Sequence, residues 1–346
     1  MSDSDYNYIL PKGFIANAPA DPRDASRLFV YSIKTNEIVL DTFANLARYV
    51  PAGSVLVIND TKVVPARLEL SNLSGRSLRV LILFNEWDGG PMVKGLPDKD
   101  VATGEPLFWN ERPCLEAASH VRQEFTFRLL MPAAEFERLC EKHGQTPLPP
   151  YIHTALPEKE LREKYQTTFA ANPSSVAAPT ASLHFTPGVF RSLDDKDVKR
   201  AAVTLHVGRG TFSPVSSEMA STGKLYPEPI QIGEESARMV AEAKRAGRTV
   251  VAAGTTSVRL LESVPEAILE GKGYHGETTL FIRPPYRFVV VDALLTNFHL
   301  PGTSLLMLLD AFLRFKGAKK SWRDLYDRAI EEKFRFYSFG DAMLII

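Results

Sequence analysis

Cysteine is scarce in the sequence, and neither charge is in excess. Only Cys114 and Cys140 occur among the 346 residues, far apart and in no metal-binding or redox spacing, so no disulfide framework is indicated and a reducing compartment is favoured. Lysine plus arginine and aspartate plus glutamate each number 41, which gives a formal net charge of zero. Because affinity for nucleic acid comes largely from neutralised phosphates, this balance argues against a dedicated nucleic-acid-binding protein but allows a local basic patch.

Long apolar runs and several catalytic signatures are missing as well. No run approaches the roughly 20 apolar residues that cross a membrane, and residues 1–13 lack the basic and apolar regions of a signal peptide. No pair of histidines has the His-x-x-x-His spacing of a zinc site, and no Gly-x-Ser-x-Gly elbow of an α/β-hydrolase occurs. We therefore expect a cytoplasmic globular protein that has no metal site and no membrane-spanning segment.

Four apolar runs are present, and each ends in a compact polar cluster. The runs are residues 53–58, 201–205, 248–253 and 288–295. Continuous apolar runs of this length are typical of strands buried on both faces of a parallel sheet. Helical patterns alternate with them, at 234–246, at 305–312 and at 322–330. This alternation predicts an α/β fold, with a mostly parallel sheet covered by helices.

Residues 66–150 follow another pattern. ARLEL and SLRVLILF flank a Ser-Asn-Leu-Ser-Gly turn and predict a β-hairpin, and FTFRLLM predicts a further strand, with no alternation of strand and helix. A chain of this length is also too long for one ordinary core. We therefore expect two domains: an α/β domain formed by 1–65 and 151–346, interrupted by an inserted β-barrel domain at 66–150.

The polar clusters mark a candidate site, because ligands of open α/β sheets bind beyond the carboxyl ends of the strands. Their residues are Asn59, Asp60 and Thr61; His206, Gly208, Gly210 and Thr211; Gly254, Thr255, Thr256 and Ser257; and Asn297, His299 and Ser304. An isolated His206 would more often be a hydrogen-bonded core histidine, but the two glycines that follow it permit positive φ and close approach of the backbone to a ligand. The Gly254–Ser257 turn precedes a predicted helix, whose free N–H groups and hydroxyls would hold a carboxylate or phosphate.

Other polar residues could belong to the same site or to the surface. They are Thr180 and His184; Arg259 and Glu262; Arg23, Asp24 and Arg27; and Lys62, Arg67 and Arg335. Arg259 and Glu262 are one helical turn apart and could form only a surface ion pair. The cations, with the aromatic residues that flank Arg335, could grip a phosphate backbone and stack a base. Solvated surface charge is the alternative for each of them.

Eight motifs in order along the chain are similar to those of one enzyme family. They are YILPKGFIANAPADPRDASRL, VINDTKVVPARL, TPLPPYI, YQTTFAANPSSVAAPTASLHFT, VTLHVGRGTFSPV, AAGTTSVRLLES, DALLTNFHLPGTSLLMLLDAF and FRFYSFGDAMLI. The chain resembles the S-adenosylmethionine:tRNA ribosyltransferase-isomerases of queuosine biosynthesis from about residue 6 to residue 346, most weakly in 85–125. The resemblance implies an α/β domain interrupted by a β-barrel. It also implies transfer and isomerisation of the ribosyl part of S-adenosylmethionine onto 7-aminomethyl-7-deazaguanine at the tRNA wobble position, which gives epoxyqueuosine, adenine and methionine.

This chemistry requires a base beside the sulfonium, an acid for the departing adenine and a group that holds the methionyl carboxylate. We expect His206, Asp60 and His299 to be catalytic, and the Gly254–Ser257 turn to hold the carboxylate. The remaining candidates are expected to bind substrate, apart from Lys62, Arg67 and Arg335, which are expected to bind RNA. S-adenosylmethionine is expected as a substrate, tRNA as the partner and a monomer as the acting form, with no cofactor and no metal.

Two segments depart from the family pattern. Where family members usually have His-His-Met-His-Ser-Glu, counting without gaps gives Gly223 to Glu228 here, and only the glutamate is kept. The family's His-Leu-Pro-Lys-Ser-Thr is here His299 to Ser304 (HLPGTS), without the lysine. Two alternatives therefore stay open. One is a lapsed or altered-specificity paralogue that binds a nucleoside, S-adenosylmethionine or RNA without this reaction. The other is an enzyme that transfers from S-adenosylmethionine to a small acceptor.

Overall fold

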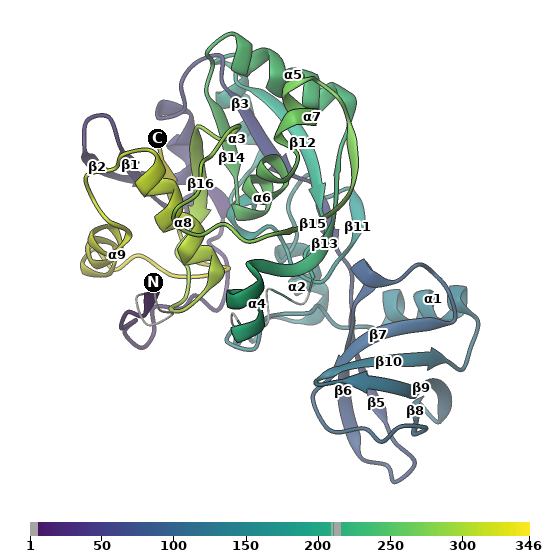
Figure 1. Cartoon of the computed structure of the whole chain (residues 1–346). Coiled ribbons are helices and arrows are strands. Elements are labelled where there is room, and N and C mark those ends of the chain that lie inside the picture. The colour runs from purple at the N-terminus through teal and green to yellow at the C-terminus, as the bar shows by residue number, and fades with distance from the viewer. Residues whose placement is uncertain (1–5, 209, 211–215) are drawn as a thin grey trace.

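Nine strands form the central sheet of the molecule (Figure 1). The computed structural model describes residues 6–208, 210 and 216–346. In spatial order the sheet consists of β15 (Tyr274–Leu280), β13 (Lys224–Ile232), β12 (Lys199–Leu205), β3 (Val55–Asn59), β14 (Val250–Ala253), β16 (Ala293–Asn297), β17 (Ala342–Ile345), β1 (Arg27–Ser32) and β2 (Glu37–Thr42). Neighbouring strands are parallel from β12 through β3 and β14 to β16, and β17 is parallel to β1. The other pairs are antiparallel, so the predicted α/β fold is confirmed, but the sheet is mixed rather than mostly parallel.

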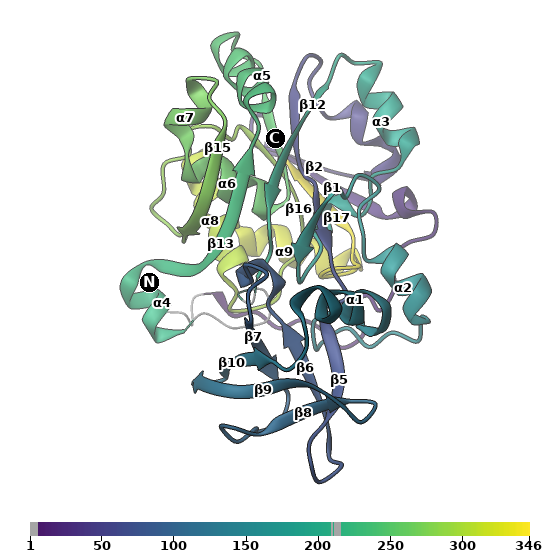
Figure 2. The same cartoon turned by 90° about the vertical axis from the view of Figure 1, so that its right-hand side faces the viewer.

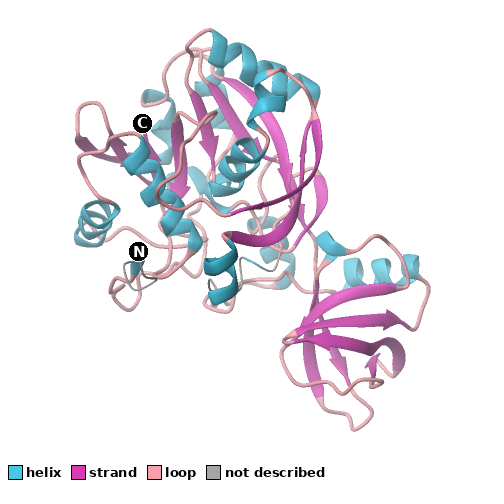
Figure 3. Cartoon of the chain, viewed as in Figure 1, coloured by secondary structure: helices cyan, strands magenta, loops and turns pink. Residues whose placement is uncertain are grey.

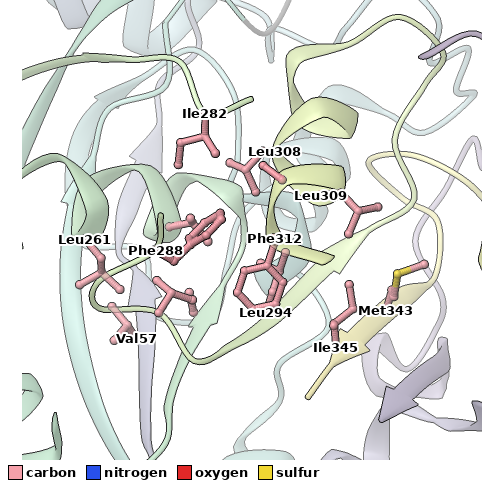
Figure 4. Packing of buried hydrophobic residues seen from close by; sticks show 14 of the residues in the cluster. Val57, Leu261, Ile282, Phe288, Leu294, Leu308, Leu309, Phe312, Met343 and Ile345 are labelled. Atoms are coloured by element: carbon pink, nitrogen blue, oxygen red, sulfur yellow. The ribbon is translucent and has the colours of Figure 1, made fainter. Parts of the chain in front are cut away.

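Helices cover both faces of the sheet, because strand side chains alternate between two apolar clusters. The helices are α1 (Ala133–His143), α2 (Glu158–Lys164), α3 (Pro187–Asp194), α4 (Ser217–Thr222), α5 (Glu234–Arg245), α6 (Thr255–Ser263), α7 (Pro265–Leu269), α8 (Ser304–Phe315) and α9 (Trp322–Glu331), with 3-10 turns η2 (Arg23–Ala25), η3 (Phe43–Arg48), η4 (Phe84–Glu86) and η5 (Thr180–Ser182). Val57 of β3 faces α5, α6 and α8, whereas Ile58 faces α3 and η3. Figure 4 shows the first cluster, where the rings of Phe312 and Phe288 meet edge to face.

The predicted strands and helices are largely confirmed, and one strand begins later than expected. β3, β12 and β14 begin and end within two residues of the predicted runs, and α5, α8 and α9 follow the predicted helical patterns. The run 288–295, however, becomes a strand only at Ala293. The backbone N–H groups of residues 289–291 donate instead to the Glu262 carboxylate, at 2.8 to 3.0 Å. These buried donors are therefore satisfied without a sheet ladder, through a distant contact that periodicity does not show.

The barrel is an antiparallel structure inserted after β4 (Thr61–Val63), which pairs with β11 (Asn172–Ser175). Around the closed barrel its strands are β10 (Glu124–Leu129), β7 (Met92–Pro97), β6 (Ser77–Ile82), β5 (Arg67–Ser71), β8 (Pro106–Trp109) and β9 (Arg112–Val121). The predicted hairpin is β5 and β6, and the apolar face of α1 packs onto the barrel core.

Figures 1 and 2 place the barrel at the end of the molecule opposite α5, and Figure 3 contrasts its strands with the helix-covered sheet. The barrel inserted into the α/β fold is thus confirmed, while the domain boundaries at 66 and 150 stay a prediction. Among the residues that the structure describes, no helix is long and apolar enough to cross a bilayer.

Candidate active site

A pocket lies at the carboxyl ends of β14 and β16, where residues of three of the four predicted polar clusters meet. The predicted site residues that line it are Thr180, Gly210, Gly254, Thr255, Thr256, Arg259, Asn297, His299 and Ser304. They come from the η5 turn, the loop after β12, the start of α6 and the segment that joins β16 to α8. The sheet brings these segments together, because the parallel strands β14 and β16 end at the same edge.

Aromatic side chains and one carboxylate complete the wall of the pocket. They are Tyr151, Tyr165, Tyr226, Phe298, Tyr337 and Glu228. None of them is among the predicted site residues, although Tyr337 is one of the aromatic residues beside Arg335 that could stack a base. An aromatic residue in a loop motif resembles an ordinary core residue. A signal was nevertheless available: Tyr151 lies in TPLPPYI and Tyr337 in FRFYSFGD, which are two of the family-like motifs.

The start of α6 presents unpaired polar atoms to the pocket. Gly254 precedes the helix with a φ of 90°, a left-handed conformation that glycine adopts without steric cost. Thr256 Oγ1 and Arg259 Nη2 are buried and have no hydrogen-bond partner in the described part of the chain. Ser257, in contrast, donates its hydroxyl to the Ala253 carbonyl at 2.8 Å. First-turn N–H groups, a free hydroxyl and a free guanidinium donor together form an anion-binding set.

Arg259 forms a buried ion pair with Glu228. Arg259 Nη1 donates to Glu228 Oε2, and Nε donates to the Leu280 carbonyl at 3.1 Å. The other Glu228 oxygen accepts from the Gly208 N–H at 2.9 Å. The alternative of a surface pair between Arg259 and Glu262 is wrong, because both residues are buried and Glu262 binds the backbone before β16. Burial raises the pKa of Glu262, and those N–H groups oppose the shift.

Two buried histidines flank Asn297 at the end of β16. Thr180 Oγ1 donates to Asn297 Oδ1 at 2.9 Å, and His184 Nε2 lies 3.4 Å from Asn297 Nδ2, behind the pocket wall. His299 Nε2 lies 3.0 Å from the Thr296 hydroxyl. Burial lowers the pKa of His184 to about 4 and the pKa of His299 to about 3. Both imidazoles are therefore neutral at neutral pH, which suits hydrogen bonding better than proton storage.

A second polar group lies at the ends of β3 and β12. We call it the β3–β12 cluster; it consists of Asn59, Asp60, Thr61, His206 and Gly208. Thr61 Oγ1 lies 2.8 Å from His206 Nδ1. Asp60 Oδ1 accepts from the Thr204 hydroxyl at 2.6 Å and from the Asn172 amide at 3.0 Å. Burial lowers the pKa of His206, and the nearby Asp60 carboxylate opposes this shift. The imidazole is only half-buried, so it is held by a rigid element and stays accessible.

Val207 joins the two groups, since it follows His206 and lines the pocket. The two glycines permit a positive φ, but Gly208 does not adopt one. The backbone at Gly208 closely approaches another part of the chain, since a Cβ atom there would lie 2.6 Å from the amide nitrogen of Asn85; the expected approach to a ligand stays a prediction. Asn85 belongs to η4, so a segment between barrel strands approaches the loop after β12. Thr211, a further predicted residue of this loop, lies outside the described residues.

The predicted residues just before β1 and at its first position bind other parts of the fold. Arg23 and Arg27 each donate to a backbone carbonyl at 2.6 Å, that of Glu163 and that of Glu332. Asp24 Oδ2 accepts from the Thr186 hydroxyl at 2.6 Å. These bonds fix the chain entry to β1 against α2, α3 and the end of α9. The described part of the chain contains no group of three or more His, Cys, Asp or Glu side chains placed to hold a metal.

The three predicted RNA-binding cations differ in exposure and pairing. Lys62 is exposed on β4. Arg67 is partly buried where the chain enters the barrel, and its Nη2 donates to the Leu148 carbonyl at 3.0 Å. Arg335 forms an ion pair at 2.8 Å with Asp341, which is fully buried. Two of the three guanidinium or ammonium groups therefore make contacts within the fold.

Comparison with known proteins relates the whole chain to one family. Residues 3–345 match the family described as "Queuosine biosynthesis protein". An S-adenosylmethionine:tRNA ribosyltransferase-isomerase of Thermotoga maritima is 42% identical over 346 residues, which is all of both chains. Its counterpart from Thermus thermophilus is 42% identical over 351 residues, covering 99% of this chain and 98% of that one. A crystal structure of an S-adenosylmethionine tRNA ribosyltransferase from Thermotoga maritima matches 100% of both chains, with a TM-score of 0.54 and 31% identity.

The chain belongs to the S-adenosylmethionine:tRNA ribosyltransferase-isomerase family. This family of transferase-isomerases acts in queuosine biosynthesis, a tRNA modification. The similarity includes the inserted barrel as well as the sheet, because the matches extend over the full length of the chain. The family resemblance stated from the eight motifs is therefore confirmed.

Proposed function

We propose that the pocket binds S-adenosylmethionine, and that the chain transfers and isomerises its ribosyl group onto 7-aminomethyl-7-deazaguanine at the tRNA wobble position. Epoxyqueuosine in tRNA, adenine and methionine are the products. The observation that carries this proposal is the 42% identity to a ribosyltransferase-isomerase over all of both chains. The protein acts in the cytoplasm as a monomer. It needs no cofactor, because the sulfonium of S-adenosylmethionine already activates the ribosyl group for transfer.

The methionyl carboxylate binds at the start of α6. Thr256 Oγ1 and Arg259 Nη2 supply donors that have no partner within the described residues, and the first turn of the helix adds its N–H groups. A carboxylate at this place would satisfy all of them at once. Glu228 keeps the guanidinium in position, because it accepts from Nη1 and leaves Nη2 free.

His206 moves the proton next to the sulfonium. Its lowered pKa keeps the imidazole neutral and able to accept a proton at neutral pH, and Thr61 fixes the ring by a hydrogen bond at Nδ1. Asp60 stabilises the imidazolium that forms, by charge rather than by direct contact. His299 contributes a hydrogen bond from inside the pocket, since its neutral form is strongly favoured by burial.

The tRNA wobble base enters the pocket from the side on which the barrel approaches the loop after β12. Lys62 on β4 contributes a phosphate contact there. Residues 66–150 fold as a separate domain in this proposal. Zero net charge limits the number of neutralised phosphates, so the affinity for tRNA should depend only weakly on salt.

The test is an incubation of the purified protein with S-adenosylmethionine and tRNA that carries the 7-aminomethyl-7-deazaguanine precursor, followed by nucleoside analysis. The expected result is epoxyqueuosine in the tRNA and one adenine released per modified base. A matched reaction with tRNA that has guanine at the wobble position should release no adenine. Adenine release with that control tRNA would contradict the proposal and favour transfer to a small acceptor.

An altered-specificity paralogue is the second candidate, and one observation favours it. Leu225 and Tyr226, which stand in the segment that departs from the family pattern, both line the pocket. A tyrosine where the family usually has histidine changes both the shape and the proton chemistry of that wall. Tight binding of S-adenosylmethionine without turnover on the precursor tRNA would support this candidate.

A further inference from the structure

Two tyrosines from distant parts of the chain form a right-angled corner in the pocket. The ring centroids of Tyr151 and Tyr337 lie 4.0 Å apart, with 90° between the ring planes. Both residues line the pocket, and they are 186 positions apart in sequence. The corner therefore exists only because the fold brings the segment after the barrel against the segment before β17.

The backbone of Tyr337 is held in an unusual conformation. Its φ is 73°, in the left-handed region that bulky residues rarely occupy. Hydrogen bonds fix the residue on both sides, because its N–H donates to the Phe298 carbonyl at 3.0 Å and its carbonyl accepts from the Gly340 N–H at 3.0 Å. Strained residues of this kind gather at ligand sites, where the surrounding structure maintains them.

No unpaired carboxylate among the described lining residues is available to bind a cationic ligand. Among the described lining residues, Glu228 is the one acidic side chain, and Arg259 already pairs with it. Aromatic ring faces carry negative potential and attract cations, most strongly where water is excluded. The Tyr151 hydroxyl and the Tyr337 side chain are both buried, so the corner is poorly accessible to water.

We propose that the corner of Tyr151 and Tyr337 recognises the sulfonium cation of S-adenosylmethionine and so determines the selectivity of the pocket for the charged substrate. The inference rests on the proposed function, since it names the part of that substrate which the corner binds. A planar base is the other candidate occupant, but rings at 90° with centroids 4.0 Å apart leave no slot between them for stacking. A compact trialkyl cation fits into a right-angled corner.

The test compares the dissociation constants of three ligands by calorimetry, without tRNA and without turnover. S-adenosylmethionine carries the sulfonium, S-adenosylhomocysteine has a neutral thioether instead, and sinefungin has a protonated amine on carbon at that place. The expected order is that both cations bind more tightly than the thioether. Tyr337→Phe and Tyr151→Phe should keep this preference, because phenylalanine retains the ring face.

Tyr337→Leu and Tyr151→Leu should each reduce the preference for the cations by roughly 5- to 30-fold, which is the range expected for a dry cation–π contact. Tyr286→Leu, outside the pocket lining, is the matched control and should leave the preference unchanged. Phenylalanines of increasing fluorination at position 337 keep the ring shape and weaken its negative face. The preference should fall stepwise along that series, which tests the corner even if a leucine variant fails to fold.

The inference would be overturned if the leucine variants lost affinity by the same factor for all three ligands. It would also be overturned if the fluorination series left the preference for the cations unchanged. Both results would leave the proposed function intact, because S-adenosylmethionine would still bind to the wild-type protein. Failure of the wild-type protein to bind any of the three ligands would overturn the proposed function together with this inference.

Discussion

The pocket and the barrel place their ion pairs in opposite environments. At the pocket, the side chains of Arg259 and Glu228 are 9% and 6% exposed, whereas those of Arg79 and Asp98 on the barrel are 57% and 34% exposed. Burying two charges costs desolvation energy that their attraction offsets only with good geometry, while an exposed pair costs little and contributes little. The barrel is therefore held together by its apolar core. Near the pocket the chain keeps a costly pair, and in the proposed function this pair orients a donor toward the ligand.

The histidines show the same contrast. His206, at the sheet edge, is half-buried and bonded to Thr61, whereas His120 on the barrel is exposed beside the Phe125 ring. A rigid, partly desolvated imidazole can be tuned for proton transfer, and a solvated one cannot. Substitutions at matched positions should therefore have different effects in the two regions: at the pocket they should change turnover or ligand binding, and on the barrel they should change neither.

The largest effect is expected for His206. His206→Ala should lower turnover by roughly 10²- to 10⁴-fold if the imidazole carries the proton, and should leave S-adenosylmethionine binding nearly unchanged. His206→Asn should restore little, because an amide keeps a hydrogen bond but cannot carry a proton. His120→Ala is the matched barrel control and should leave turnover unchanged. Single-turnover kinetics and thermal midpoints, measured on the same preparations, separate the two roles of the side chain.

The acid side of the pH profile tests the same residue. Because burial lowers the pKa of His206, the acid limb of kcat/KM should have its midpoint below about 6.5, the unperturbed value. That limb should be lost in His206→Asn. Wild-type turnover in His206→Asn would exclude proton transfer, and a lower thermal midpoint with normal turnover would make His206 a structural residue.

The next effect concerns the two ion pairs. Arg259→Met leaves the buried Glu228 without its ion-pair partner and should lower the free energy of unfolding by about 3–5 kcal/mol. Arg79→Met on the barrel should lower it by about 0–1 kcal/mol. Adding Glu228→Gln to Arg259→Met should recover part of the lost stability but none of the S-adenosylmethionine affinity. Urea unfolding measures the first quantity and calorimetry the second; equal destabilisation by the two arginine substitutions would remove the contrast.

The sequence predicts the strands of the central sheet better than the residues that line the pocket. Continuous apolar runs identify β3, β12 and β14, because strands buried on both faces need apolar residues at every position. The delayed start of β16 is not predictable in this way. It depends on Glu262, a residue of α6 that binds the preceding backbone through the fold.

The pocket shows the same limit. Gly254 and Thr256 are identifiable because the turn and the helix start are adjacent in sequence. The contact between Tyr151 and Tyr337 is not, because only the folded chain brings their rings together, although both residues stand in family-like motifs. Glu228 is a similar case: its pairing with Arg259 joins β13 to α6. Local sequence patterns therefore locate the strand ends, whereas tertiary contacts determine which other residues line the pocket beside them.

Acid should destabilise the sheet edge through two further histidines. The pKa values of His184 and His299 are about 4 and about 3 in the folded chain, and near 6.5 when unfolded. The unfolded chain then binds protons more readily, so stability is lost as the pH falls from about 6.5 toward these values. The expected slope is about 1.4 kcal/mol per pH unit for each histidine.

His299→Gln should reduce the dependence of the free energy of unfolding on pH by the contribution of one histidine. Urea unfolding at several pH values between 6 and 4 measures this dependence. His120→Gln, on the exposed face of the barrel, is the control and should keep the wild-type slope. A slope that His299→Gln leaves unchanged would show that His299 is not held neutral by burial.

The smallest effect is expected for tRNA affinity. Lys62→Gln should weaken binding by only a few-fold and reduce the slope of log K against log salt by about one, the value for one phosphate contact. Lys142→Gln, on α1 at the barrel, is the matched exposed control and should leave the slope unchanged. Arg335 is unsuitable for this test, because its removal leaves the buried Asp341 without its ion-pair partner. Filter binding of precursor tRNA at several salt concentrations gives both slopes. A reduced slope for Lys142→Gln and not for Lys62→Gln would place the phosphate contact on the barrel instead of the sheet edge.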